Sequence, residues 1–433
     1  MARGTPETLE KLRALHPSEE PATALNGVQL AAPPKIGSGF SRTTECSSFY
    51  RTVLHDLPRF SAPGVSGWTY ELVQLCWSEV ESFPEALMMI VRGIVSGTMP
   101  LRSWWLACRL IALDKGGGKV RPIAVSDCIY RLAARALMAT LDLEELIPSW
   151  QLGVKSRGGC EPAVHLIRAR LAAGWKVVQI DWSNAFNSIS RAALFDTLRG
   201  RSAARKMMRM VRYAYAVPSK LFTTMDDGSL STLSSSSGVR QGDPLAMLMF
   251  AVFLEPVMRE AGLPEDIQTI AIVDDVSLMI PPGSASFDNQ DQILERLAAR
   301  ALQGGLRLNL DKCVTLLQAD LDQESTAVRV LGAYLGDSAA FVGGDGACEG
   351  AVGAVADKWL DRLRAIDALP RQIGLLLLRS SVVAGMVHLC RMMPPSQMAA
   401  AAARLDEGVQ DLVLGWVGAL NSEGAVADGL DPS

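Results

Sequence analysis

The sequence predicts an α+β chain in which short strand pairs alternate with helices, followed by a region built from helices alone. Two hairpins indicate the β component. Apolar strands flank a glycine turn in residues 109–125, and Ile- and Val-rich strands flank an acidic pair in residues 269–280. Beyond about residue 340 the chain becomes rich in Ala, Leu and Met with helical periodicity. At 433 residues, 49% of them hydrophobic, the chain can bury a large core in roughly two or three domains.

Charge is distributed unevenly along the chain. The formal net charge of −4 argues against a polyanionic partner. Residues 101–220, however, hold 20 Lys or Arg and 8 Asp or Glu, a net charge of +12, so the remainder carries −16. An asymmetry of this size marks residues 101–220 as a candidate surface for nucleic acid.

Cysteine spacing and hydropathy exclude several classes of protein. The eight cysteines are scattered without a CxxC pair or a nearby histidine cluster, which excludes a zinc finger and favours reduced core thiols. No uninterrupted apolar run reaches the roughly 18 residues of a membrane helix, and residues 1–20 lack an apolar signal core. We therefore expect a soluble, intracellular protein without zinc and without a membrane anchor.

Composition suggests four regions. Residues 1–45 are rich in Pro, Ala, Gly, Ser and Thr, which predicts a mobile leader. Residues 46–340 carry the strands and helices described above. Residues 341–420 form a separate helical region, and residues 421–433 a polar tail.

The acidic pair is the first candidate site. Asp274 and Asp275 interrupt an apolar run at the point where a tight hairpin would turn. A buried carboxylate needs a partner, and with no Lys or Arg nearby a divalent cation is the simplest one. Hard oxygen ligands favour Mg²⁺. A solvated acidic turn such as Asp226-Asp227 explains this stretch equally well when it is taken alone.

Three further patterns carry candidate residues. The apolar strand 176–180 ends at Asp181, a place typical of a ligand and equally of a helix cap. The glycine turn of the first hairpin carries Lys115 and Arg121, which suit phosphate binding or simple solvation.

The third pattern is Gln241-Gly242 followed by Asp243-Pro244. Asp243 is expected as the N-cap and Pro244 as the first residue of an apolar helix. Gln241 and Gly242 would then lie just outside a helix N-terminus, where the backbone can approach a ligand closely.

The order of these motifs is more specific than any one of them. The basic hairpin is followed by Asp181 with Phe186 five residues later, by Gln-Gly-Asp-Pro, by the Asp-Asp hairpin, and by Gly-Leu-x-x-Asn-x-x-Lys ending at Lys312. Over roughly residues 60–395 this order resembles the polymerase domain of reverse transcriptases. The Pro-Gly-Val-Ser-Gly-Trp-Thr stretch at 63–69 and the Val-Leu-Gly-Ala-Tyr-Leu-Gly stretch at 330–336 fit the non-LTR retrotransposon branch most closely. The resemblance implies a right-hand polymerase fold, with fingers and palm in residues 46–340, an antiparallel palm sheet backed by helices, and a thumb-like region in residues 341–420.

The resemblance also implies roles for individual residues. Asp181 and Asp274 would hold two Mg²⁺ ions, with Mn²⁺ as a possible substitute, and Asp275 would complete the acidic cluster. Phe186 would lie under the sugar of the incoming nucleotide and exclude a 2′-hydroxyl. The remaining contacts to the nucleotide would come from Lys115, Arg121, Gln241, Gly242 and Lys312.

The implied function is RNA-directed DNA synthesis from a primer 3′-hydroxyl with dNTPs as substrate. An RNA template and a DNA primer or nicked DNA target would be the partners, and nuclear residence would fit the family. Ile272 departs from the family pattern, which has an aromatic residue there. The alternatives are an RNA-directed RNA polymerase, against which Phe186 argues, and an inactive or domesticated remnant that binds RNA. The sequence predicts no oligomeric state.

Overall fold

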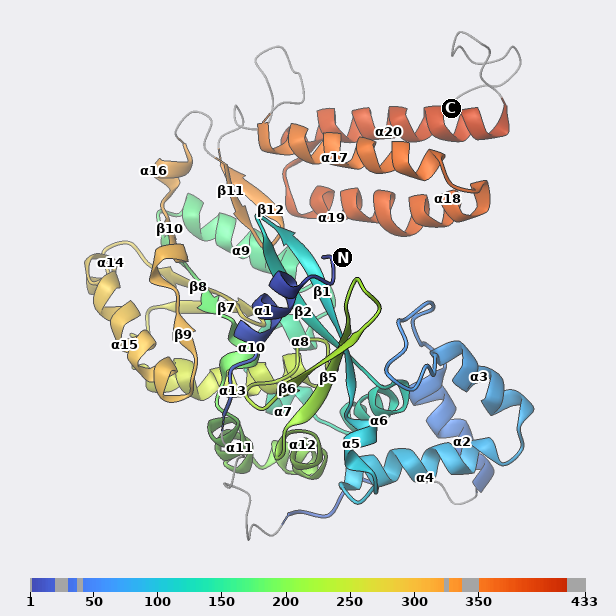
Figure 1. Ribbon diagram of the computed structural model, residues 1–433. Coiled ribbons are helices and arrows are strands. Elements are labelled where there is room, and N and C mark those ends of the chain that lie inside the picture. The colour runs from blue at the N-terminus through green and yellow to red at the C-terminus, as the bar shows by residue number, and fades with distance from the viewer. Residues whose placement is uncertain (1, 20–29, 37–41, 323–326, 337–349, 419–433) are drawn as a thin grey trace. The chain divides into compact units, whose positions relative to one another are not determined.

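The computed structural model describes residues 2–19, 30–36, 42–322, 327–336 and 350–418 (Figure 1). Contacts between residues divide the chain into two compact units that interleave along the sequence. The first unit comprises Met1–Ser156, Ile180–Val276 and Asp288–Cys313, and the second comprises Arg157–Gln179, Ser277–Phe287 and Val314–Ser433. The four predicted regions were defined by composition, whereas these two units are defined by contacts. The boundaries of the four regions therefore stay predictions.

A four-stranded sheet in the order β2-β1-β5-β6 is the main β element of the first unit (Figure 1). Strands β1 (Cys108–Gly116) and β2 (Lys119–Ser126) form the antiparallel hairpin that residues 109–125 predict. Strand β5 (Ser219–Thr224) runs parallel to β1, and β6 (Leu230–Ser235) pairs antiparallel with β5. Burial alternates along the first half of β1, as expected for a strand with one face against a core.

Helices carry many of the buried apolar side chains of the first unit. Among the longer ones, α4 (Phe83–Ser96) ends at Gly97 in a left-handed C-cap, and Asp127 caps α6 (Cys128–Met138). The other helical segments described in this unit are α2 (Arg42–Phe49), η2 (Tyr50–Leu54), α3 (Tyr70–Glu79), α5 (Arg102–Trp105), α7 (Leu143–Leu146), α8 (Leu152–Lys155), α10 (Ala185–Ser188), α11 (Arg191–Arg199), η3 (Ala203–Lys206), α12 (Met208–Tyr215), α13 (Ala246–Glu260), α15 (Gln290–Gln303) and η4 (Leu310–Lys312).

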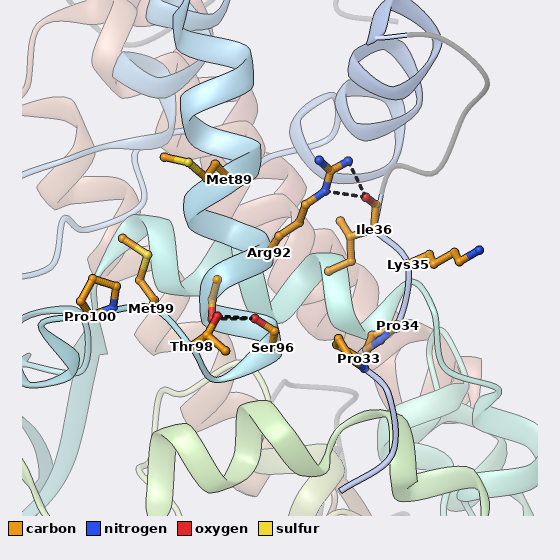
Figure 2. Close-up of a pocket in the computed structure, with 11 residues that line it drawn as sticks. Pro33, Pro34, Lys35, Ile36, Met89, Arg92, Ser96, Thr98, Met99 and Pro100 are labelled. Carbon is orange, nitrogen blue, oxygen red and sulfur yellow. Dashed lines mark hydrogen bonds between the residues drawn. The ribbon is translucent and has the colours of Figure 1, made fainter.

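A hollow of about 880 Å³ opens beside α4, against residues 33–36 (Figure 2). Met89 and Met99 line it, and Arg92 closes one side by donating two hydrogen bonds to the carbonyl of Ile36 at 3.1 and 3.0 Å. None of the site residues predicted from the sequence lines this hollow.

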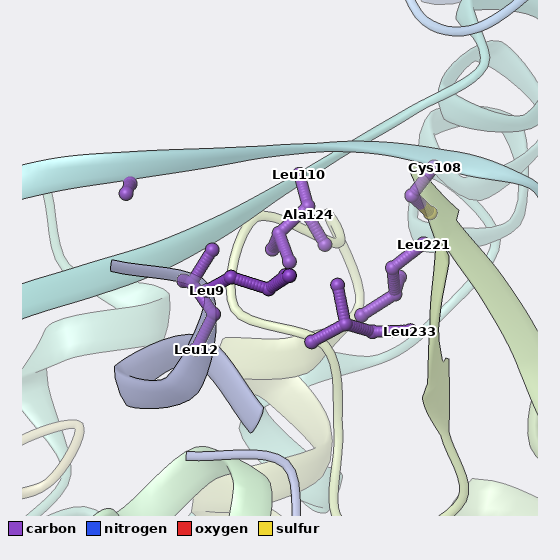
Figure 3. Close-up of a cluster of buried hydrophobic side chains, with 8 residues drawn as sticks. Leu9, Leu12, Cys108, Leu110, Ala124, Leu221 and Leu233 are labelled. Atoms are coloured by element: carbon purple, nitrogen blue, oxygen red, sulfur yellow. The ribbon is translucent and has the colours of Figure 1, made fainter. Parts of the chain in front are cut away.

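A helix lies within the stretch expected to be a mobile leader. Helix α1 (Pro6–Ala14) begins after Thr5, whose side chain caps it. Leu9 and Leu12 of α1 are buried in a cluster with side chains of β1, β2, β5 and β6 (Figure 3). The described part of residues 1–45 therefore includes a segment held by apolar packing.

The second unit combines short strands with long helices. Strand β3 (Lys176–Ile180) pairs antiparallel with β10 (Val314–Leu316), and β11 (Ala327–Val330) forms a hairpin with β12 (Ala333–Gly336). The helical segments of this unit are α9 (Cys160–Ala172), α14 (Ala285–Asp288), α16 (Gln318–Leu321), α17 (Gly350–Asp367), α18 (Arg371–Leu377), η6 (Leu378–Val383), α19 (Ala384–Met392) and α20 (Pro395–Val417). The expectation of helices in the C-terminal part of the chain is confirmed for residues 350–418.

One continuous helical stretch of the second unit, Arg371–Met392, is long and apolar enough to cross a membrane by length and composition. The sequence did not flag it, because Arg379 interrupts its apolar run. Within the unit this stretch packs against its neighbours. A Cβ on Gly385 would meet the Trp359 ring at 2.2 Å, so glycine permits the close approach of α17. Only 28% of its apolar window is buried, however, and a single helix that passes by length and composition alone is weak evidence for a membrane span.

Candidate active site

The acidic pair lies in a turn between two strands, as the sequence predicts. Strand β7 (Gln268–Ile272) ends two residues before Asp274, and β8 (Asp275–Ile280) begins at the second acid. Val273 turns the chain in a left-handed conformation with φ of 58°. For a β-branched residue this conformation is strained, and such strain concentrates at functional sites.

Gln151 holds this turn in place. Its side-chain oxygen accepts a hydrogen bond from Val273 N at 2.7 Å, and its amide donates to Val273 O at 3.0 Å. Gln151 is fully buried, so both bonds form away from water. Gly153 packs against the same turn, and a Cβ there would meet Val273 N at 2.6 Å. Sequence reasoning missed Gln151, because its partner lies 122 residues away.

Asp181 lies beside the segment that carries Lys312. The Asp181 carbonyl accepts a hydrogen bond from Asn309 N at 2.8 Å, and β4 (Trp182–Ser183) pairs antiparallel with β9 (Arg307–Leu308). The Lys312 ammonium consequently reaches to 3.8 Å from the Asp181 carboxylate, and both side chains remain partly exposed. Two residues predicted from separate motifs thus form an ion pair.

The three acids lie within electrostatic reach of one another. Burial raises the pKa of Asp274, and Asp181 adds to the rise. Burial, then the charges of Asp274 and Asp181, raise the pKa of Asp275 to about 6. Asp275 still has a solvent-exposed face, so an ion from solution can reach it.

The basic residues of the first hairpin belong to the same neighbourhood. Arg121 and Lys115 lower the pKa of both Asp274 and Asp275. Burial and the charge of Arg121 lower the pKa of Lys115, while Asp274 and Asp181 raise it. These opposing influences mean that the predicted acids and the predicted phosphate ligands surround one region of the first unit.

Glycine forms the tip of this hairpin for a conformational reason. Gly116, Gly117 and Gly118 all have φ between +59° and +79°, a left-handed region in which other residues are strained. The turn therefore projects Lys115 and Arg121 from a backbone that only glycine forms easily.

The donor chemistry of the three acids fits a divalent cation. The carboxylates offer hard oxygen ligands, and their mutual repulsion is what a bound cation would relieve. Within the described part of the chain, no three His, Cys, Asp or Glu side chains are arranged so that they could hold a metal ion together.

Phe186 lies on α10, close to the strand end that carries Asp181. Its ring stacks on Phe250 of α13, with centroids 5.2 Å apart and planes inclined by 26°. Its carbonyl accepts a hydrogen bond from Val239 N at 2.7 Å, which joins α10 to the residues just before Gln241. Gly238 makes this junction possible, because a Cβ there would come within 2.3 Å of Phe186 O.

Gln241 and Gly242 form a turn against β2. The Gln241 carbonyl accepts a hydrogen bond from Ala124 N at 2.7 Å. Gly242 has φ of 109°, and a Cβ on it would lie 2.8 Å from Ala124 O. The turn is thus attached to the strand that also carries Arg121.

The expected helix start after Gly242 is wrong. Helix α13 begins at Ala246 with Leu245 as its N-cap. Asp243 Oδ1 still accepts a hydrogen bond from Leu245 N at 2.9 Å, the local bond expected of a residue at a helix start. Its other carboxylate oxygen accepts from Arg240 at 2.7 Å, Tyr130 at 2.8 Å and Tyr215 at 2.7 Å. The Asp243 carboxylate thus combines a local bond at the start of the helix with bonds to Arg240 and to two long-range partners.

This buried polar network lies directly under the Gln241–Gly242 turn. The side chains of Arg240 and Asp243 are 1% and 0% exposed, and Arg240 also donates to Ser219 Oγ at 2.9 Å. Burial raises the pKa of Tyr130 and of Tyr215 well above the ordinary value, so both hydroxyls stay protonated and donate. Sequence reasoning did not single out Arg240, Tyr130 or Tyr215.

Comparison with known proteins identifies the family of this chain. The model of the family described as reverse transcriptase (RNA-dependent DNA polymerase) matches residues 113–335. Similar curated proteins include the retrotransposable element SLACS 132 kDa protein of Trypanosoma brucei gambiense, which is 28% identical over 54% of this chain and 20% of its own length. The Pol polyprotein of the type-2 retrotransposable element R2DM of Drosophila melanogaster is 26% identical over 50% of this chain and 22% of its own length.

The chain spans only about a fifth of the length of these two relatives. Among solved structures, apo telomerase from Candida tropicalis, truncated from its C-terminal domain, aligns with a TM-score of 0.35 and 12% identity. That alignment covers 49% of this chain and 50% of that chain, and a likeness of this extent carries no conclusion.

The matched stretch covers about half of the chain and contains every site residue that the sequence predicted. It confirms the resemblance on which those predictions rest. The chain therefore belongs to the reverse transcriptase family, as a domain of the non-LTR retrotransposon type.

Proposed function

We propose that this chain is an RNA-directed DNA polymerase that extends a primer 3′-hydroxyl with dNTPs. One observation carries the proposal. The charge of Asp181 raises the pKa of both Asp274 and Asp275, while Lys115 and Arg121 of a neighbouring hairpin lower the pKa of the same two acids. Acids for metal ions and cations for phosphates are the two electrostatic requirements of nucleotidyl transfer.

The parts of the fold suit the right-hand anatomy that the family implies. The basic hairpin β1–β2 would belong to the fingers. The strand ends that carry Asp181 and Asp274 would form the palm together with the helices that support them, and α17–α20 would form a thumb. Family membership and the placement of the acids at strand ends support this assignment.

Asp181, Asp274 and Asp275 would hold two Mg²⁺ ions, with Mn²⁺ as a substitute. When bound, the ions would activate the primer hydroxyl and neutralise the charge that develops on the triphosphate. The chain's own contribution is to fix the ligands. Gln151 locks the turn before Asp274, and pairing of β4 with β9 fixes the backbone after Asp181.

The remaining predicted residues would bind the nucleotide. Lys115 and Arg121 would contact the triphosphate, and Lys312 would lie near the phosphates because it already pairs with Asp181. The backbone of Gln241 and Gly242 would contact the template and the nucleotide.

Phe186 distinguishes the leading proposal from an RNA-directed RNA polymerase. Its ring is fixed by stacking on Phe250, so it would present a rigid wall to the sugar. A ribonucleotide polymerase must admit a 2′-hydroxyl at this place. An inactive RNA-binding remnant is the other alternative, and the retention of three mutually repelling carboxylates argues against it.

An RNA template and a DNA primer or nicked DNA target would be the partners. The basic character of residues 101–220 supports binding to phosphates. Binding should then weaken steeply with added salt, because each phosphate contact releases a counterion. An intracellular, soluble protein acting in the nucleus would match a retrotransposon product.

Primer extension on an RNA template with Mg²⁺ tests the proposal. The chain should incorporate dNTPs and largely reject rNTPs. A preference for rNTPs would instead favour the RNA polymerase, and RNA binding without incorporation of either substrate would favour the remnant.

A further inference from the structure

The N-terminal segment, residues 2–19, lies across several parts of the first unit rather than on one of them. At its start, Ala2 N donates to Ala112 O at 2.9 Å. Gly4 N donates to Asp226 Oδ1 at 2.7 Å, while Asp226 N donates back to Gly4 O at 3.0 Å. Glycine is required at this contact, because a Cβ on Gly4 would meet Thr224 O at 2.7 Å. The segment is therefore fastened to the sheet of the basic hairpin.

The middle of the segment is fixed by apolar packing. Leu12 is 1% exposed and Leu9 is 9% exposed, and both contact the buried face of the sheet (Figure 3). Lys11 of the same helix reaches toward the hairpin tip, with its ammonium 3.8 Å from where a Cβ on Gly118 would lie.

The far end of the segment contacts the turn between Asp181 and Phe186. Asn184 Nδ2 donates a hydrogen bond to Leu15 O at 2.9 Å. Asn184 itself has a left-handed backbone with φ of 51°, and its Oδ1 accepts from Asn187 Nδ2 at 3.1 Å. Asn adopts this conformation more readily than most residues, and the Leu15 carbonyl and Asn187 fix its side chain here.

Glu19 fixes the next helix in the same direction. Its carboxylate accepts from Ser190 Oγ at 2.8 Å and from Arg191 N at 3.2 Å, which places an acid at the N-terminus of α11. The N-terminal segment thus contacts the chain on both sides of Phe186, through Leu15 before it and through Glu19 after it.

We infer that the N-terminal segment positions the Asp181–Phe186 turn relative to the basic hairpin, with Asn184 and Glu19 as positioning residues. The inference rests on the proposed polymerase function. Asn184 lies three residues after a proposed metal ligand and two residues before the proposed sugar contact. A small displacement of this turn moves both groups away from the nucleotide, and misplacement of reacting groups slows an enzyme strongly.

Two single substitutions in the full chain test the inference. Asn184→Asp removes the donor to Leu15 O and keeps the size and the acceptor. Glu19→Gln turns one acceptor of the α11 cap into a donor. Glu7→Gln is the matched control, because Glu7 is exposed and its carboxylate pairs with Lys11 of the same helix.

Hydrogen exchange of residues 185–191 is the first readout. Both variants should exchange these amides about tenfold faster than the wild type, and Glu7→Gln should not. Thermal melts and RNA binding close to those of the wild type would show that the fold is retained. Unchanged exchange in both folded variants would overturn the inference.

Primer extension is the second readout. Asn184→Asp should lower kcat/KM for dNTPs about tenfold and reduce the preference for dNTPs over rNTPs, while Glu7→Gln should leave both unchanged. Wild-type kinetics and sugar preference in both variants would contradict a positioning role. A wild-type chain that incorporates nothing would refute the proposed function alone, since hydrogen exchange still decides the contact.

Discussion

Replacing Asp243 by Asn should destabilise the first unit by about 3 kcal/mol. The carboxylate is 0% exposed and pairs at 2.7 Å with Arg240, which is 1% exposed. Loss of one partner from a buried ion pair costs about 3–5 kcal/mol, because the remaining charge is left without compensation. We expect the lower end of this range, since the Asn oxygen can still accept one hydrogen bond. Tyr130 and Tyr215 both donate to the same carboxylate oxygen, and an amide cannot serve them and Arg240 together.

Urea unfolding followed by tryptophan fluorescence measures this loss, because Trp182 is buried in the same unit. Asp227→Asn is the matched control. Asp227 lies in an exposed turn and accepts a bond from Ser229 N that an Asn oxygen can also accept, so the control should stay within about 0.5 kcal/mol of the wild type.

The double variant Arg240→Met/Asp243→Asn, measured beside both single variants, tests whether the two charges are coupled. Removing both charges should be less damaging than the sum of the two single losses by at least about 1 kcal/mol, since no unpaired charge is left buried. A loss below about 1 kcal/mol in Asp243→Asn, or simple additivity in the double variant, would refute a buried ion pair under the Gln241–Gly242 turn.

Three further outcomes are expected. Gly242→Ala should reduce nucleotide incorporation more than about tenfold at unchanged RNA affinity. The φ of 109° and the 2.8 Å distance from a Cβ to Ala124 O both exclude a side chain at this position. Wild-type incorporation by this variant would show that the turn tolerates a Cβ. Phe186→Val should raise rNTP use relative to dNTP use in primer extension, and an unchanged ratio would argue against the sugar contact. Burial lowers the pKa of His16 below 6.5, so the unfolded chain binds the proton more readily. The melting temperature should therefore fall as the pH drops from 7 to 5, and less so in His16→Gln; equal falls in both would contradict this.

Local chemistry made the acidic residues predictable. Asp274 and Asp275 interrupt an apolar run, and Asp181 ends an apolar strand, so the sequence alone marks each position as unusual. The basic hairpin could be predicted for the same reason, because its two strands and the glycine turn that joins them lie in one continuous stretch of sequence.

Long-range partners could not be predicted. Gln151 clamps Val273 from 122 residues away, and Tyr130 reaches Asp243 from 113 residues away. The second of these partners places Asp243 in a buried network that the local bond to Leu245 N does not reveal. Contacts between such distant residues produce no local sequence pattern from which either pair could be predicted.

The N-terminal helix was missed for a related reason. Composition marked residues 1–45 as a leader, whereas only Leu9 and Leu12 in α1 supply buried anchors. Two apolar residues three positions apart are too weak a pattern to predict a docked helix. Their partners on the sheet lie about a hundred residues or more further along the chain.

Single-turnover nucleotide incorporation by Asp274→Asn tests the central claim most directly. The substitution removes one proposed metal ligand with almost no change in shape, and Asp227→Asn makes the same change on an exposed turn. We predict that Asp274→Asn binds the RNA template and primer normally but incorporates dNTPs at least about a thousandfold more slowly, whereas Asp227→Asn matches the wild type. Equal rates in all three proteins would contradict a metal-dependent site at Asp181, Asp274 and Asp275.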